Sequence, residues 1–292
     1  MATTVSPDRS QRRLRFGVDT LFLILALIYL LVPLGAMLAF GLSGDSLFSS
    51  FQKIFSDKDF YNTLLTSLEL AVTATLLSLI LITPTAYWVQ IRLPKLRVLL
   101  EILSLIPFAV PAIVLSLGLL EVYGTPDTLT AIFSFGLVPL LSGPPFTIAN
   151  TPPLLACAYV IISLPFVYRP IDNSLRALNA TVLTEAGQSL GANWWNIFWH
   201  VILPNIWPGM ISAALLTFST AMGEYTLASL FGIYTFPNYL NQVGQMDPHE
   251  AASLSVFSFI LTLICVLAII LLLRRRADAA GSEGGSEIVA IK

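Results

Sequence analysis

The stretch EAGQSLGANWWNIFWHVILP, residues 185–204, interrupts a chain that is otherwise rich in long apolar runs. It carries three tryptophans, a histidine and a glutamate, so it is too polar to cross a lipid bilayer. It is also too apolar to be a free loop in water. Such a segment has to lie against the membrane surface or against another protein.

The composition of the whole chain is that of an integral membrane protein. Of its 292 residues, 56% are hydrophobic and 11% are charged, and the mean hydropathy is +0.81. Soluble domains usually carry about 25% charged residues. A membrane helix needs about 20 mostly apolar residues. Six windows meet this requirement: roughly 18–42, 63–90, 98–122, 152–173, 208–231 and 251–273. The sequence therefore predicts an all-α membrane protein with six transmembrane helices.

The positive charges predict the orientation of these spans. Six spans place both termini on the same side, and cytoplasmic flanks collect Lys and Arg. Every basic residue except Lys53 and Lys58 lies on the side of the termini. We therefore expect cytoplasmic tails at 1–17 and 274–292 and a transmembrane domain at 18–273. On the outer side, residues 129–141 are expected to form a short interfacial or capping segment.

The opening stretch falls in the largest predicted cytoplasmic loop, residues 174–207. Its pattern predicts two short helices joined at Gly191, because glycine suits the left-handed conformation that ends a helix. Asn179 or Thr181 is the expected cap of the first helix. One face of that helix is expected to carry Val182, Ala186 and Leu190.

The second short helix is predicted to begin after Asn193 and to end at Pro204, which lacks the N–H that a helix interior needs. Three of its side chains recur at helical spacing and, beside Trp194 and Phe198, form the expected apolar face: Trp195, Trp199 and Ile202. Taken alone, such a helix fits a resting place at the lipid interface, where tryptophan is favoured.

The spacing of a few residues within this loop points to a protein partner instead. The residues are Glu185, Ala186, Gly187, Gly191, Val201, Leu203 and Pro204. Their pattern resembles E-A-A-x-x-x-G-x9-I-x-L-P, the cytoplasmic signature of the permease subunits of binding-protein-dependent, type I ABC importers. The sequence departs at Gly187, where a second Ala is usual, and at Val201, where Ile is usual. GEYTLASLFG, residues 223–232, is similar to a segment of the polyamine, ferric-ion and phosphonate branch.

This resemblance implies an assembly in the plasma (inner) membrane of a prokaryote. The expected partners are a second permease subunit, identical or homologous, two ATP-binding subunits and an extracytoplasmic solute-binding protein. The chain has no Walker A pattern, so ATP and Mg²⁺ are expected in the ATP-binding subunits. No enzyme activity, resident cofactor, metal site or nucleic-acid partner is expected for this chain.

The resemblance also implies roles for the loop residues. Glu185 is expected to contact the ATPase surface, its alternative being an ordinary solvated carboxylate. The small residues Ala186 and Gly187 permit close approach, and Gly191 permits the turn. Leu203 and Pro204 mark the return to the bilayer.

Acidic residues inside the spans are the candidates for a solute path, because a charge in a membrane is costly. Glu224, beside Tyr225, either lines the path or makes a structural hydrogen bond. Glu69 either contacts solute or makes a polar contact between helices, and Thr66, Ser67 and Thr73 are its expected neighbours. Two further charged residues have other expected roles. Glu101 is expected to pair with Arg97, one helical turn away. Arg169 is expected either to pair with Asp172 or to snorkel to the membrane surface.

The charges in the spans also bear on the solute. Acids without a central Lys or Arg favour a cationic or neutral solute. With the family resemblance, this makes a polyamine the first choice, followed by ferric ion or phosphonate. The alternative function is a secondary transporter driven by an ion gradient, which usually shows internal repeats that this sequence lacks.

Overall fold

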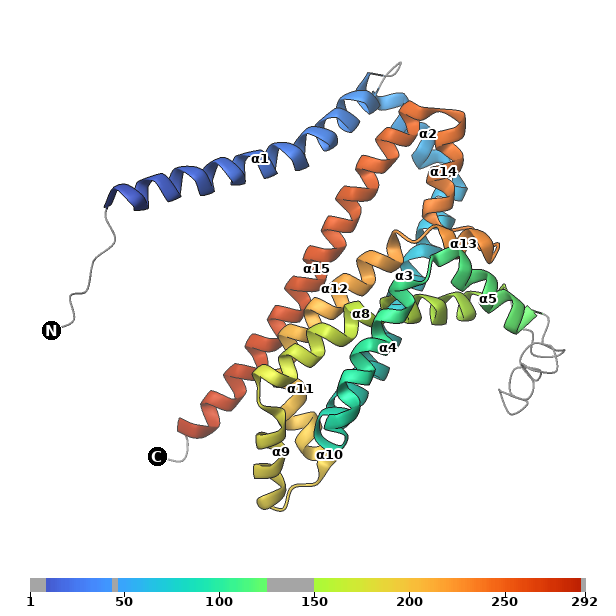
Figure 1. Ribbon diagram of the computed structural model, residues 1–292. Helices are drawn as coiled ribbons and strands as arrows, with labels where there is room; N and C mark the ends of the chain where they lie inside the picture. The colour runs from blue at the N-terminus through green and yellow to red at the C-terminus, as the bar shows by residue number, and fades with distance from the viewer. Residues whose placement is uncertain (1–8, 44–46, 125–149, 290–292) are drawn as a thin grey trace. The chain divides into compact units, whose positions relative to one another are not determined.

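The computed structural model describes residues 9–43, 47–124 and 150–289, and every regular element in those ranges is a helix (Figure 1). The described chain divides into two compact units. One is formed by residues 1–56 and 240–259, and the other by 57–239 and 260–292. The predicted segment 129–141 lies outside the described residues.

The first unit contains helices α1 (Arg9–Leu42) and α2 (Leu47–Ser56) and the junction of α14 (Phe236–Met246) with α15 (Pro248–Val289). The ring of His249 stacks on Phe40 at 4.2 Å, and Lys53 forms an ion pair of 2.9 Å with Glu250. The most apolar 18-residue window of the stretch Thr20–Gly41 is 0% buried by the chain itself. Lipid or another subunit has to cover it.

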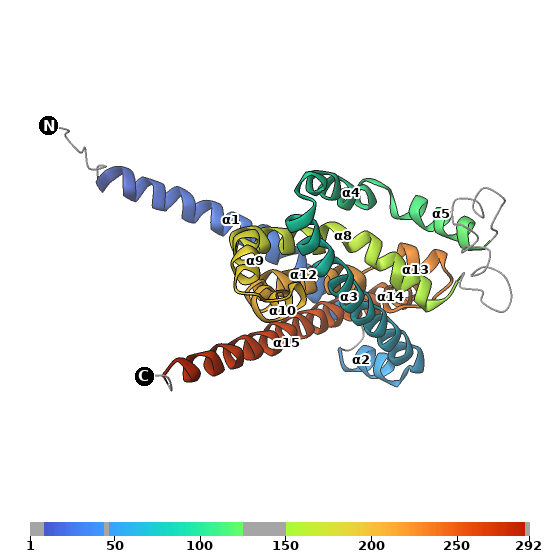
Figure 2. The same ribbon diagram turned by 90° about the horizontal axis from the view of Figure 1, so that it is seen from below.

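The second unit is built on three long helices that pack against one another: α3 (Lys58–Arg92), α8 (Pro152–Ala177) and α12 (Trp207–Met222). Figures 1 and 2 show them side by side in both views. Among the described glycines, Gly209 marks the closest approach of α12 to α8. A Cβ there would clash with the side chain of Ser174 and lie 2.7 Å from the carbonyl oxygen of Pro170.

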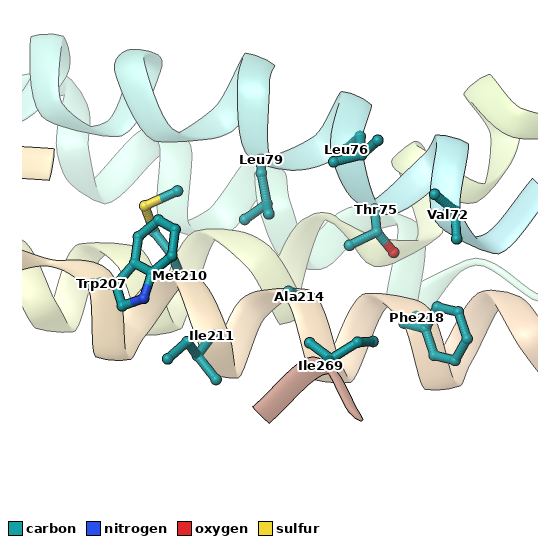
Figure 3. Close-up of a pocket in the computed structure, with 10 residues that line it drawn as sticks. All are labelled: Val72, Thr75, Leu76, Leu79, Trp207, Met210, Ile211, Ala214, Phe218 and Ile269. Carbon is teal, nitrogen blue, oxygen red and sulfur yellow. The ribbon is translucent and has the colours of Figure 1, made fainter. Parts of the chain in front are cut away.

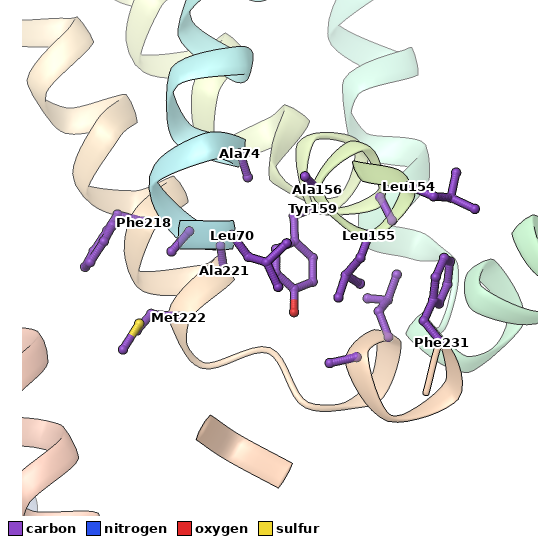
Figure 4. Close-up of a cluster of buried hydrophobic side chains, with 14 residues drawn as sticks. Leu70, Ala74, Leu154, Leu155, Ala156, Tyr159, Phe218, Ala221, Met222 and Phe231 are labelled. Carbon is purple, nitrogen blue, oxygen red and sulfur yellow. The ribbon is translucent and has the colours of Figure 1, made fainter. Parts of the chain in front are cut away.

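Two clusters of buried side chains hold these helices together. The first lies around Leu155, Tyr159 and Phe218, and α13 (Thr226–Leu230) and Phe231 close one side of it (Figure 4). The second lies farther along the same helices, around Tyr87, Ile171 and Ile202, and includes residues of the loop that follows α8. The loop is therefore part of a core rather than an appendage.

The predicted third window, 98–122, is not one straight helix. Helix α4 (Arg97–Ala109), preceded by the short helix at Pro94–Leu96, and α5 (Ala112–Gly124) are bent by 98° relative to each other. Val110 is extended (φ −89°, ψ 126°) because it precedes Pro111, whose ring disfavours a helical conformation at that position.

The fifth window, predicted as one helix over 208–231, is wrong in extent. Helix α12 ends at Met222, and α13 is a separate short helix. Within the described residues, four helices are long and apolar enough to cross a membrane, and up to six spans result when each bent pair counts as one. The all-α membrane class is confirmed.

Candidate coupling loop and translocation path

The first helix of the loop is α9 (Ala180–Ser189). It follows Asn179, which adopts a left-handed conformation (φ +53°) and makes no side-chain capping bond. The inner face is small and buried, with Ala180 at 0% and Thr184 at 1% exposure. The predicted apolar face points the other way. Val182 is 63% exposed and Leu190 89% exposed, and Glu185 and Ala186 are exposed with them.

The predicted turn at Gly191 is confirmed. Its φ is +82°, and a Cβ there would meet nothing within 4 Å, so conformation rather than space favours glycine. The N–H of Ala192 donates to the carbonyl of Gly187 at 3.0 Å and closes the helix end. The chain is thereby turned back toward α3 and α8.

Gly187 replaces the alanine that is usual in the signature, and the structure supplies a reason. A Cβ at this position would lie 2.9 Å from Cδ1 of Ile197. Ile197 is 1% exposed and belongs to the second core cluster. Glycine therefore lets the two short helices of the loop pack directly on each other.

The second helix of the loop is composite: α10 (Trp194–Ile197), a π-helical turn (Phe198–Ile202) and α11 (Leu203–Asn205). The predicted face of Trp195, Trp199 and Ile202 is wrong. Both tryptophans are 54% exposed, whereas Ile202 is fully buried. The wider π turn shifts the residues after Phe198 around the helix axis, so regular helical spacing misplaced them.

The predicted end at Pro204 is also displaced. Pro204 lies within the composite helix, in the three-residue segment α11 that directly follows the π turn. The break comes at Ile206, and the segments Trp194–Asn205 and Trp207–Met222 are bent by 71°. Leu203 packs at the edge of the second core cluster.

An aromatic group anchors the loop to α3. The ring of Tyr87 lies 5.4 Å from that of Trp194 and 5.2 Å from that of Phe198. Its hydroxyl is 2.9 Å from Oγ1 of Thr184 on α9. Sequence reasoning missed Tyr87, because a tyrosine within a long apolar helix gives no sign of what it touches.

The ion pair at the other side of the core joins α4 to α8. Nε and a terminal nitrogen of Arg97 donate to the carboxylate of Asp172 at 2.9 and 2.8 Å, and Asp172 is 6% exposed. Arg97 therefore pairs with Asp172 and not with Glu101, and the expected pair of Arg169 with Asp172 is wrong. Arg169 is exposed, and its other alternative, snorkelling, stays a prediction. A bidentate contact in a buried site outweighs a one-turn pair on the helix surface.

Three of the path candidates on α3, Thr66, Glu69 and Thr73, lie on an exposed polar stripe. Asn62 extends this stripe at helical spacing. Thr66 is partly exposed, and the other three are exposed. Ser67 departs from the expected group, since it is buried and its Oγ accepts a 2.8 Å hydrogen bond from the N–H of Phe236.

Glu224 is held by its own chain. Its carboxylate accepts from the N–H groups of Thr226 and Leu227 at 2.9 to 3.1 Å and of Ala228 at 3.3 Å, and so caps α13. This is the structural hydrogen bonding that was one of its two alternatives. Tyr225 beside it is 41% exposed. A part in the solute path remains a prediction for both residues.

A groove between α3, α12 and α15 is unsuited to a charged solute (Figure 3). Its lining side chains are apolar except for Thr75, whose hydroxyl already donates to the carbonyl of Ala71 at 2.7 Å. Its walls include Leu76, Met210 and Ile269. A charge placed there would lose its hydration without gaining a partner.

Comparison with known families identifies the chain. Residues 78–279 match the model of the binding-protein-dependent transport system inner membrane component. The chain belongs to this family. It is thus a multi-pass permease of a binding-protein-dependent transporter, in a family of transport proteins rather than enzymes. The matched region contains the whole loop 174–207, helices α8 and α12, and the C-terminal part of α3 from residue 78.

Individual relatives differ in the solute that their names give. The molybdenum transport system permease protein ModB of Azotobacter vinelandii is 34% identical over 57% of this chain and 70% of its own. PotB, a spermidine/putrescine transport system permease protein of Escherichia coli, is 33% identical over 60% of this chain and 62% of its own, which is less than two thirds. The sulfate transport system permease protein CysW of Synechocystis is 30% identical over 88% and 92%.

A solved structure has the same fold. It is that of a bacterial ABC transporter involved in the import of the acidic polysaccharide alginate. The superposition has a TM-score of 0.64 at 16% identity and covers 91% of this chain and 96% of that one.

Proposed function

We propose that this chain forms half of the solute path of an ATP-driven importer and couples to a cytoplasmic ATPase through loop 174–207. A second permease subunit supplies the other half. Two ATP-binding subunits hold ATP and Mg²⁺, and an extracytoplasmic protein delivers the solute. The membrane is the plasma membrane of a prokaryote.

The observation that carries the proposal is the outward face of α9. Val182 and Leu190 expose apolar surface beside the carboxylate of Glu185, although the loop has a well-packed inner side. Exposed apolar patches with polar neighbours are typical of protein interaction sites. Docking of an ATPase would bury both apolar side chains and give Glu185 a partner.

Charge reversal at Glu185 tests this docking. We expect Glu185→Arg to weaken binding of the ATPase subunits about tenfold or more, since it replaces an attraction by a repulsion at the interface. The measurement is co-purification of candidate ATPase subunits with the detergent-solubilised complex. Glu121→Arg makes the same charge change at an exposed position of α5 and serves as the control. Undiminished ATPase binding of Glu185→Arg would remove the docking role.

For the solute, we propose a small charged molecule. A polyamine is the first choice, followed by ferric ion, which is also a cation, or by the phosphonate anion. Support comes from the stripe around Glu69, which offers a carboxylate and three uncharged polar groups. Residues 63–91 of the same helix hold no Lys or Arg. A multivalent cation is attracted by such a surface, whereas an anion is repelled.

An oxyanion is the second candidate, because relatives are named for sulfate and molybdenum transport. Uptake by the assembled transporter in proteoliposomes distinguishes the two. We expect spermidine uptake to fall about fivefold or more in Glu69→Gln, from loss of one charge contact of about 1 kcal/mol. Glu121→Gln makes the same change at an exposed position of α5, outside the stripe, and should leave it unchanged. Uptake of sulfate or molybdate but not spermidine would overturn the cation proposal.

A further inference from the structure

Tyr87 occupies the last turns of α3 at a point where three separate elements meet. It is fully buried, although its neighbour Trp88 is 49% exposed. The side chain contacts α9 through its hydroxyl and the second helix of the loop through its ring. One residue of a long membrane helix thus touches both halves of the loop.

The hydrogen bond between Tyr87 and Thr184 has a defined direction. The Thr184 hydroxyl donates its single proton to the carbonyl of Ala180 at 2.7 Å. The Tyr87 hydroxyl is therefore the donor in the 2.9 Å contact, and Thr184 Oγ1 is the acceptor. Both residues are almost fully buried, so water does not compete for this bond.

The ring contacts are nearly parallel. Trp194 is inclined by 28° to the Tyr87 ring and Phe198 by 32°, while Trp194 and Phe198 are inclined by only 6° to each other at 5.8 Å. Stacked rings in a packed core resist sliding because each displacement opens a void. Tyr87 is therefore held by α9 through its hydroxyl and by the second helix of the loop through its ring.

We propose that Tyr87 is a positioning residue that transmits movement of the loop directly to α3. This rests on the proposed docking of loop 174–207 on an ATPase. The loop is already continuous with α8 and α12 through the chain, whereas α3 is reached only by side-chain contacts. Through Tyr87, displacement of α9 moves the helix that carries the Glu69 stripe.

The position of Tyr87 on α3 supports this role. Tyr87 and Glu69 are 18 residues apart, about 27 Å along a helix, and α3 is continuous from Lys58 to Arg92. Pro84 lies between them and provides a place where the helix can bend. A shift at Tyr87 thus reaches the stripe along one continuous helix, and Pro84 is the point at which the two parts of that helix change their angle.

A labelling experiment on the complex with its ATPase subunits tests this step without knowledge of the solute. In a background of Cys157→Ser and Cys265→Ser, Thr73→Cys places a single thiol on the stripe. The measurement is the rate of maleimide labelling with and without ATP and Mg²⁺. We expect ATP to change this rate, and Tyr87→Phe to reduce the change about fivefold, the factor that corresponds to one net hydrogen bond of about 1 kcal/mol.

Matched variants separate transmission from folding. Thr184→Val removes the acceptor without changing shape and should reduce the ATP-dependent change in labelling rate as Tyr87→Phe does. Thr184→Ser keeps the hydroxyl and should keep the ATP-dependent change of the parent. Tyr61→Phe alters an exposed tyrosine of the same helix and should have no effect. An unchanged response in Tyr87→Phe, or no ATP response in the parent, overturns the proposal.

The same preparations keep the two proposals apart. We expect ATPase subunits to co-purify with Tyr87→Phe as with the parent, because Tyr87 does not reach the outer face of α9. Equal losses of ATPase binding and ATP response would mean that Tyr87 only maintains the docking surface. Absence of ATPase binding in the parent itself would instead refute the proposed function.

Discussion

The two short helices of loop 174–207 are opposites in how they use their apolar residues. Helix α9 turns small residues such as Ala180 and Gly187 inward and leaves Val182 and Leu190 exposed. The composite second helix buries Ile197, Phe198 and Ile202 almost completely. Helix α9 leaves its larger apolar side chains exposed, whereas the second helix buries one apolar face and leaves Trp195 and Trp199 about half exposed on the other.

This difference indicates a division of labour. A small inner face lets α9 lie close to its neighbours, so its position is determined by contact without a large core of its own. The aromatic inner face of the second helix supplies the burial that fixes the loop to α3. The second helix is thus the anchor, and α9 is the part offered to a partner.

The largest effect should come from removing the anchor. We expect Phe198→Ala to lower the free energy of unfolding by about 3 to 5 kcal/mol, because it leaves a cavity beside Tyr87 and Trp194. Trp199→Ala, which removes a half-exposed ring next to it, should cost about 1 kcal/mol. Thermal unfolding of the purified variants in detergent measures both. Equal losses would mean that the second helix has no distinct buried side.

An intermediate effect is expected at the turn between the two helices. Gly191→Ala places a side chain on a residue with φ +82° and should cost about 1 to 2 kcal/mol. Gly223→Ala is the control, since φ is −93° there and a Cβ would lie at an ordinary 3.6 Å from the Ser219 carbonyl. The same unfolding measurement applies. A Gly191 variant as stable as the Gly223 variant would show that the turn relaxes freely.

The smallest effect on stability should come from the outer face of α9. We expect Leu190→Ser to change the free energy of unfolding by less than about 0.5 kcal/mol, because this side chain is 89% exposed. Binding of the ATPase subunits should nevertheless weaken, and Leu190→Met, which keeps the apolar surface, should preserve it. Co-purification measures the binding of the ATPase subunits, and thermal unfolding measures the stability. A strongly destabilised Leu190→Ser would contradict the division between the two helices.

Local chemistry made several features predictable. Hydropathy predicted the all-α membrane class, and Gly191 predicted the turn between two short helices. Features that depend on contacts between distant residues were missed or wrong. Arg97 pairs with Asp172, 75 residues away, rather than with Glu101 on its own helix. The turn that separates Trp199 from Ile202 is π-helical, and regular periodicity does not anticipate such a turn.

The sequence by itself determined that this protein crosses a membrane and that residues 185–204 form a permease signature. The first follows from apolar residue types over stretches of about 20 residues. The second rests on the resemblance of the spacing in residues 185–204 to the signature of known permeases. Only the tertiary structure decided which side of each loop helix is buried, that Glu224 caps α13, and that Tyr87 joins α3 to the loop. Those outcomes depend on packing between helices that are far apart in the chain, where burial and hydrogen-bond geometry select among alternatives that the sequence leaves equal.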